Sequence, residues 1–250
     1  MYFTATATAD GVTERLFTLD DVPGVLWTPA DAGRPPGAAG GPLILLGHGG
    51  GQHKRAPGLL ARARRFVAAG FTVAAVDAPG HGDRPTAARE QRYAELARRV
   101  AAGEPLADLM TRENAELAAV AVPEWRVTLD ALLDGGHAHG PVGYWGVSMG
   151  AGLGLPFVAA DARIGAAVLG LAAGAGLVEA AARITVPVEF LLQWDDDVVP
   201  RAGGLALFDA FASAEKTLHA NPGGHTAVPA FELDSAERFF RRHLSRADPR

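Results

Sequence analysis

Apolar residues along the chain form two kinds of pattern, and the two alternate. Five short runs are apolar at almost every position, as expected for strands covered on both faces; they are 42–46, 71–76, 141–147, 162–172 and 185–194. Other segments, such as 57–69 and 231–244, have the apolar spacing of helices. This alternation predicts an α/β fold with a mostly parallel sheet and helices on both faces.

The N-terminal region has a different pattern. Residues 13–20 and 22–29 are short β-prone runs on either side of a turn, and they predict an antiparallel pair of strands. A connection rich in Pro and Gly at 31–42 then leads into the first of the apolar runs.

One segment does not fit the alternation. Residues 84–122 are too long for a single crossover and carry their own apolar positions, which predicts a small helical insertion. A helix over 123–133, with Pro123 in its first turn, should then resume the main fold. We therefore expect a single domain over residues 1–250 with a helical cap at 84–122.

Composition excludes several kinds of chemistry. The 250 residues carry a formal net charge of -5 with scattered basic residues, so nucleic acid is not an expected partner. The chain has no cysteine, which removes disulfides, thiolate metal ligands and cysteine nucleophiles. The N-terminus lacks a signal-peptide pattern and no run is typical of a membrane span, so we expect a cytoplasmic protein with no membrane partner.

Ser148 stands where an apolar run turns into a segment of helical character, in the pattern Gly146-Val147-Ser148-Met149-Gly150. A sharp turn from strand to helix forces its central residue into strained backbone angles and needs small neighbours. The N-terminus of the helix offers N–H groups to a developing oxyanion. The pattern predicts a serine nucleophile; the alternative is a serine that only fills a tight turn.

A glycine-rich loop, Gly47-His48-Gly49-Gly50-Gly51, follows another apolar run. Such a backbone can bend so that an N–H group points into a cavity, opposite the N–H of Met149. Gly50 is the first choice for this second oxyanion donor and Gly49 the second. The alternative is a flexible loop.

A serine nucleophile needs a base, and the base needs a partner that orients it. His225 lies in a Gly-rich loop after a short strand-like segment and before the last helix, so it can fold over the edge of the sheet; His219 is its main competitor. Three acids, Asp195, Asp196 and Asp197, follow the run 185–194. One can orient the base while another caps the helix that starts near residue 200.

A histidine-rich metal site is the rival hypothesis for His48, His53 and His81. Carboxylate partners at ligand spacing are missing around these residues. We expect no metal and no cofactor, and we interpret His48 and His81 as scaffold residues.

Together these motifs resemble the α/β-hydrolase family, in particular its dienelactone hydrolase-like and small serine esterase members. The shared motifs are HGGG, DAPGHG, GVSMG, an acid before Val-Val-Pro and a Gly-Gly-His loop, and they span nearly the whole chain. The family's spacing between acid and proline, counted back from Pro200, selects Asp196. The chain departs from the family at Gln193, where glycine is frequent, and it has Ser148 where dienelactone hydrolases have cysteine.

The resemblance implies an α/β-hydrolase fold and a serine hydrolase that cleaves carboxylic esters or lactones through an acyl-enzyme on Ser148. His225 would be the base, Asp196 its partner, and a small-molecule ester or lactone the substrate. A thioesterase, peptidase, carbon–carbon hydrolase or acyltransferase can use the same residues, and a non-catalytic ligand receptor is the alternative outside enzymes. The sequence leaves the oligomeric state open. We expect the 84–122 insertion to roof the acyl pocket.

Overall fold

A computed structural model describes residues 1–30, 41–104 and 107–244. Its strands are β1 (Tyr2–Ala9), β2 (Val12–Leu19), β3 (Val22–Pro29), β4 (Leu43–Gly47), β5 (Thr72–Val76), β6 (Val142–Val147), β7 (Ile164–Gly170), β8 (Val188–Gln193) and β9 (Lys216–Asn221). Its helices are α1 (Pro57–Ala68), α2 (Ala87–Ala101), α3 (Ala107–Asp134), α4 (Met149–Ala160), α5 (Ala175–Ala181), α6 (Arg201–Ala210) and α7 (Phe231–Leu244). Most of the connection predicted at 31–42 lies outside the described residues.

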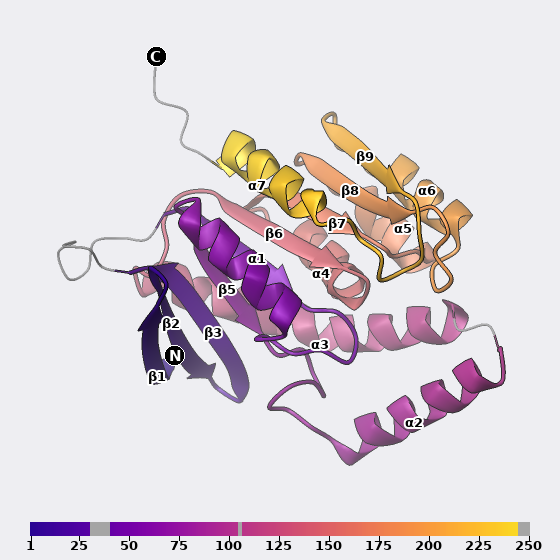
Figure 1. Cartoon of the computed structure of the whole chain (residues 1–250), viewed down its shortest axis with the longest axis horizontal. Helices are drawn as coiled ribbons and strands as arrows, with labels where there is room; N and C mark the ends of the chain where they lie inside the picture. The colour runs from indigo at the N-terminus through magenta and orange to yellow at the C-terminus, as the bar shows by residue number, and fades with distance from the viewer. Residues whose placement is uncertain (31–40, 105–106, 245–250) are drawn as a thin grey trace.

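The described strands form one sheet in the order β1-β2-β3-β5-β4-β6-β7-β8-β9 (Figure 1). Strands β4 to β9 run parallel to one another, whereas β1, β2 and β3 pair antiparallel and β3 joins β5 antiparallel. The predicted mostly parallel sheet and the antiparallel pair β2–β3 are therefore confirmed. The sequence analysis missed β1, an exposed edge strand with almost no buried positions.

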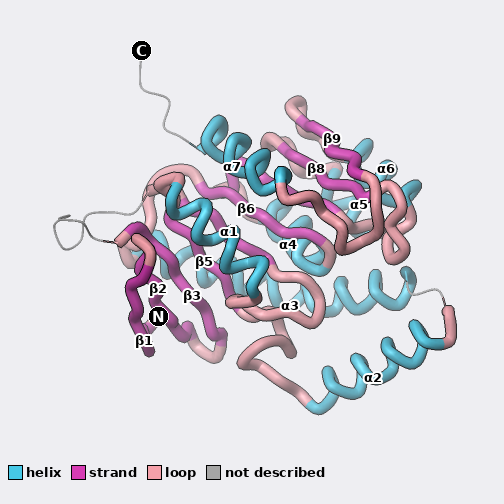
Figure 2. The backbone as a smooth tube through the Cα atoms, viewed as in Figure 1, coloured by secondary structure: helices cyan, strands magenta, loops and turns pink. Residues whose placement is uncertain are grey.

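Helices cover both faces of the sheet, as Figure 2 shows. On one face α1 and α7 pack together, and the Phe66 ring meets the Phe240 ring edge-on with centroids 5.5 Å apart. On the other face α3, α4, α5 and α6 pack over a second apolar core that includes Trp125, Tyr144 and Phe157. Parallel strands covered in this way bury nearly every residue, which explains their continuous apolar runs.

The predicted helix break at Pro123 is wrong. Helix α3 runs without interruption through Pro123, so one helix of 28 residues joins the insertion to the main fold. A proline inside a helix removes one backbone hydrogen bond. The buried residues Ala121, Trp125 and Leu129 pack this stretch of α3 into the core and compensate for that loss. Helix α2 lies farther from the sheet, beyond α3 (Figure 1).

In the described parts of the chain, no helix combines the length and the apolar character that a membrane crossing requires.

Candidate active site

Ser148 occupies the sharp turn between β6 and α4. Its φ of 57° and ψ of -125° lie outside the regions that a residue with a side chain ordinarily adopts. Strain of this kind persists only where the surrounding structure holds the residue in place. The structure thus has the strained strand-to-helix turn at Ser148 that the sequence pattern predicts.

Close backbone contacts explain the glycines beside this turn. A Cβ atom on Gly150 would lie 2.5 Å from the carbonyl oxygen of Gly47, and one on Gly146 would lie 2.6 Å from that of Gly150. The buried Tyr144 hydroxyl donates a hydrogen bond to the same Gly150 carbonyl over 2.7 Å. Burial raises the pKa of Tyr144, so this donor keeps its proton at any physiological pH. The glycines are therefore required by packing around Ser148.

The His225 ring lies between Ser148 and Asp196. Its Nε2 is 2.9 Å from the Ser148 Oγ, and its Nδ1 is 2.8 Å from Asp196 Oδ2. The three side chains come from the loops that follow β6, β8 and β9, so they meet at the carboxyl edge of the parallel strands. With its proton on Nδ1, His225 donates to Asp196 and presents Nε2 to the serine hydroxyl.

The neighbouring acids hold the His225 loop. Asp195 Oδ2 accepts the Gly223 N–H over 3.1 Å, and Asp197 Oδ1 accepts the His225 N–H over 3.3 Å. The backbone N–H of His225 also lowers the pKa of Asp197, so this acceptor stays ionised. None of the three acids caps helix α6, whose first turn has no side-chain cap, and that alternative from the sequence is wrong.

Asp196 accepts further hydrogen bonds besides its contact with His225. Its Oδ1 accepts the backbone N–H groups of Val198 and Val199, each over 2.8 Å. These bonds fix the carboxylate, so that its other oxygen faces the imidazole. Gln193, where the family often has glycine, is buried, and its side-chain amide donates to the carbonyls of Pro222 and Gly224 in the His225 loop. The departure from the family motif thus adds contacts to the loop.

The other candidate histidines have different partners. His219 Nδ1 lies 2.7 Å from Glu232, so His219 is not part of the serine site. His48 donates from Nδ1 to Gly49 O over 2.9 Å and accepts the Ala78 N–H at Nε2 over 3.0 Å. Burial lowers the pKa of His48 to about 4, so this ring is neutral at pH 7. No ring nitrogen of His48 is free for a metal ion.

Hydrogen bonds hold the glycine-rich loop after β4 at the residues on either side of Gly50. The His48 ring holds the Gly49 carbonyl, and the Gly51 N–H donates to the hydroxyl of Tyr93 over 2.9 Å. Among the described residues, the N–H groups of Gly50 and Met149 have no hydrogen-bond acceptor. A Cβ atom built on Gly50 would lie 4.0 Å from the Met149 Cβ. The two residues that carry the candidate donors are therefore close together.

Tyr93 belongs to α2, and sequence reasoning did not assign it to the site. Its hydroxyl oxygen is 2.6 Å from His81 Nε2. Since His81 Nδ1 donates to Pro79 O over 3.0 Å, Nε2 accepts the tyrosine proton. The Arg89 guanidinium lies 4.6 Å from the centre of the Tyr93 ring. Apart from its helical spacing, nothing in the sequence around Tyr93 indicates this contact, because it depends on where α2 lies.

A buried ion pair ties the loops after β4 and β5 together, and sequence reasoning missed it too. Lys54 Nζ lies 2.6 Å from Asp77 Oδ2, and the Lys54 N–H donates to Asp77 Oδ1 over 2.8 Å. Burial alone would raise the pKa of Asp77, but hydrogen bonds from Asp83 and Lys54 hold it below its usual value. Asp77 therefore stays ionised, and its contacts with Lys54 brace the glycine-rich loop.

A cavity of about 180 Å³ opens beside Ser148. Its walls are residues 171–174 after β7, residues 198–200 after β8, and Met110 and Asn114 of α3. The lining of the cavity is more apolar than polar, as expected for a pocket that holds a small organic group. The first turns of α3 thus contribute directly to the site.

Solved structures that are similar over nearly the full chain include esterases. A cold-adapted esterase from an Arctic intertidal metagenomic library, bound to PEG, shares 34% sequence identity with a TM-score of 0.80, and the match covers 98% of this chain and 100% of that one. An acetyl xylan esterase from Paenibacillus sp. R4 shares 15% identity with a TM-score of 0.71, covering 97% of this chain and 88% of that one.

A dienelactone hydrolase from Anabaena variabilis ATCC 29413 shares 19% identity with a TM-score of 0.62, covering 97% of this chain and 98% of that one. Below 25% identity such a match shows the fold alone. No family model and no curated protein matches the sequence. The identity to the cold-adapted esterase extends over both whole chains, and the chain belongs to the esterases of the α/β-hydrolase family.

Proposed function

We propose that this protein is a serine esterase in which Ser148 is the nucleophile, His225 the general base and Asp196 the residue that orients it. The observation that carries the proposal is the position of the His225 ring, within hydrogen-bond distance of both side chains. The strained backbone of Ser148 supports the same role, because it is the feature that exposes a nucleophile above a sheet.

In the proposed reaction His225 Nε2 takes the Ser148 proton while Oγ attacks the ester carbonyl. The N–H groups of Gly50 and Met149 receive the negative charge of the tetrahedral intermediate. His225 then protonates the leaving alcohol, and an acyl-enzyme forms on Ser148. A water molecule, deprotonated by His225, attacks the acyl group and releases the acid. The charged imidazole is stabilised by Asp196 in each half-reaction.

We further propose a small ester or lactone as the substrate, with the acyl group in the cavity beside Ser148. The volume of 180 Å³ is below the roughly 300–1,000 Å³ of pockets for drug-sized ligands. A short acyl chain suits this space better than a long one. Residues 84–122 serve as the cap in this proposal, because Met110 and Asn114 line the cavity and Tyr93 holds the Gly51 N–H.

The test is mass spectrometry of the intact protein after treatment with a fluorophosphonate, with Ser148→Ala as the control. We expect a single adduct that the variant does not form, because a fluorophosphonate reacts much faster with an activated serine than with an ordinary one. A series of p-nitrophenyl esters from acetate to decanoate then tests which acyl lengths the pocket accepts. The value of kcat/KM should fall for the long acyl chains. An adduct in Ser148→Ala, or no adduct on folded protein, would contradict the assignment.

A further inference from the structure

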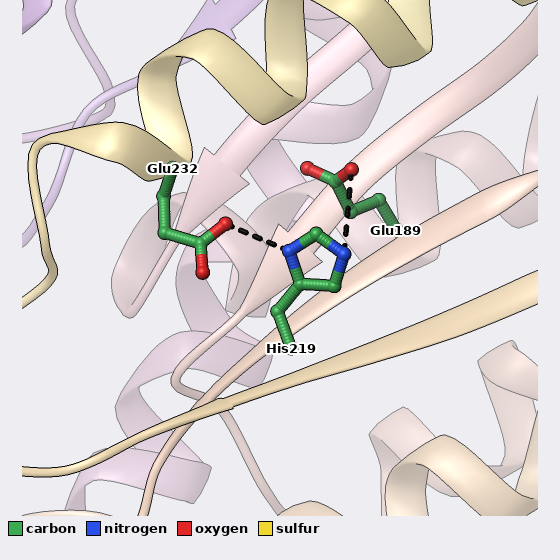
Figure 3. A group of neighbouring side chains, drawn as sticks. All are labelled: Glu189, His219 and Glu232. Atoms are coloured by element: carbon green, nitrogen blue, oxygen red, sulfur yellow. Dashed lines mark hydrogen bonds and ion pairs between the residues drawn. The ribbon is translucent and has the colours of Figure 1, made fainter.

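A second cluster of chemically active side chains lies outside the serine site, between β8, β9 and α7 (Figure 3). It consists of Glu189, His219 and Glu232, whose candidate ligand atoms all lie within 4.8 Å of one another. Glu189 is 3% exposed and Glu232 is 4% exposed. Burial and the nearby Glu232 raise the pKa of Glu189, whereas His219 and Arg238 act in the opposite direction. A cation between the two carboxylates would offset the cost of keeping both ionised at this depth.

The hydrogen bonds define which atom of His219 faces the open side of the cluster. Nδ1 lies 2.7 Å from Glu232 Oε2, and the other Glu232 oxygen accepts the Asn221 side-chain N–H over 2.8 Å. Glu232 therefore holds the proton on Nδ1. The Nε2 atom, which points toward Glu189 (Figure 3), is left with a free lone pair. Histidines that bind a metal ion almost always donate their other ring N–H to a carboxylate or carbonyl in this way.

The gap between His219 and Glu189 fits a metal ion better than a hydrogen bond. Nε2 and Glu189 Oε2 are 3.8 Å apart, too far for a hydrogen bond. Two ligands on one tetrahedral zinc ion stand roughly 3.4 Å apart, given bonds of about 2.1 Å. The observed separation exceeds this value by only about 0.4 Å.

Glu189 supplies the second observation that points to a ligand. Its Oε2 accepts a hydrogen bond from the Ser235 hydroxyl over 2.9 Å. Its Oε1 is buried and has no hydrogen-bond partner among the described residues. An orphaned carboxylate oxygen in the interior is costly, and a cation is the partner that removes this cost. The His219 side chain is 28% exposed, so an ion can enter and keep water as its remaining ligands.

We propose that His219 Nε2 and the Glu189 carboxylate bind a divalent transition-metal ion such as Zn²⁺, with Glu232 orienting the histidine. The site joins the two ends of the segment that carries His225, since His219 lies in β9 before that segment and Glu232 lies in α7 after it. Metal binding would therefore stiffen the His225 loop from its base. This role is structural and takes no part in the ester chemistry.

The test titrates the metal-free wild-type protein with ZnCl₂ by calorimetry. We expect one site that also raises Tm, and an affinity that falls at least tenfold in His219→Gln and in Glu189→Gln. Glu232→Gln should weaken binding by about 10-fold to 100-fold, the range typical of residues that orient a ligand. His225→Gln is the matched control and should bind as the wild type does.

Unchanged binding in His219→Gln would overturn the proposal, as would binding lost in His225→Gln, which would place the ion at the serine site. Absence of any binding by the wild type at millimolar zinc would overturn it too. If a variant fails to fold, wild-type crystals soaked in zinc decide the question. An anomalous peak within bonding distance of His219 Nε2 supports the site, and a map with zinc only elsewhere refutes it.

Discussion

The loop after β4 and the loop after β9 each present a histidine at the carboxyl edge of the sheet, and their contacts give the two rings opposite properties. His48 is 2% exposed, and both of its ring nitrogens bind backbone groups. His225 binds two side chains, a hydroxyl on one nitrogen and a carboxylate on the other. The comparison teaches that a ring locked by backbone atoms positions a loop, whereas the ring between Ser148 and Asp196 has the contacts that the proposed proton transfer requires.

The largest expected effect is the loss of the proposed base, His225. His225→Ala should lower kcat for p-nitrophenyl acetate by about 10⁴-fold to 10⁶-fold, because Ser148 then has no proton acceptor. Steady-state ester hydrolysis measures the loss, with His139→Ala as a control, because His139 is exposed and precedes β6, whereas Ser148 follows that strand at its other end. A His225→Ala enzyme within tenfold of the wild type would show that another group is the base.

Removal of the orienting carboxylate should cost somewhat less. Asp196→Asn should lower kcat by about 10⁴-fold, because the amide favours the wrong tautomer of His225 and cannot stabilise its charged form. The matched controls are Asp195→Asn and Asp197→Asn, whose side chains accept only backbone N–H groups of the loop. If either control loses more activity than Asp196→Asn, the acid has been assigned to the wrong residue.

His48 should show its effect in stability. Its pKa is about 4 in the folded protein and about 6.5 when unfolded, so between these values only the unfolded state takes up the proton. The free energy of unfolding therefore falls as pH drops from 6.5 toward 4, by up to about 3 kcal/mol from this residue. Urea unfolding at several pH values, compared with His48→Gln, isolates the contribution. A difference between the two proteins that does not change with pH would contradict it.

Tyr93 should give the smallest effect of the four. Tyr93→Phe removes the acceptor of the Gly51 N–H and the donor to His81, which loosens the peptide next to the proposed Gly50 donor. We expect kcat to fall about tenfold, less than the loss of an oxyanion donor itself, with KM and Tm nearly unchanged. Tyr2→Phe, on an exposed residue, is the control. A rise in KM with kcat unchanged would show that α2 acts on substrate binding instead.

Sequence patterns predicted the parallel strands and helices α1 and α7 well, because continuous burial and one-sided burial leave different periodicities. They failed at Pro123, where local propensity favours a helix start but the packing of Trp125 and its neighbours keeps α3 intact. They also missed β1, since an exposed edge strand carries no apolar signal. Both errors concern segments whose conformation is decided by contacts distant in sequence.

For the candidate site, the sequence by itself determined the glycines around Ser148, the acidic cluster before Pro200 and the glycine-rich loop of His225, since each reflects a local backbone requirement. Only the tertiary structure decided which acid faces the base, that Tyr93 reaches the Gly51 N–H, and that Glu189 and Glu232 meet at His219. These contacts join residues between 13 and 42 positions apart. The direction of each side chain across such a separation is fixed by how strands and helices pack, and that information is not contained in any local pattern.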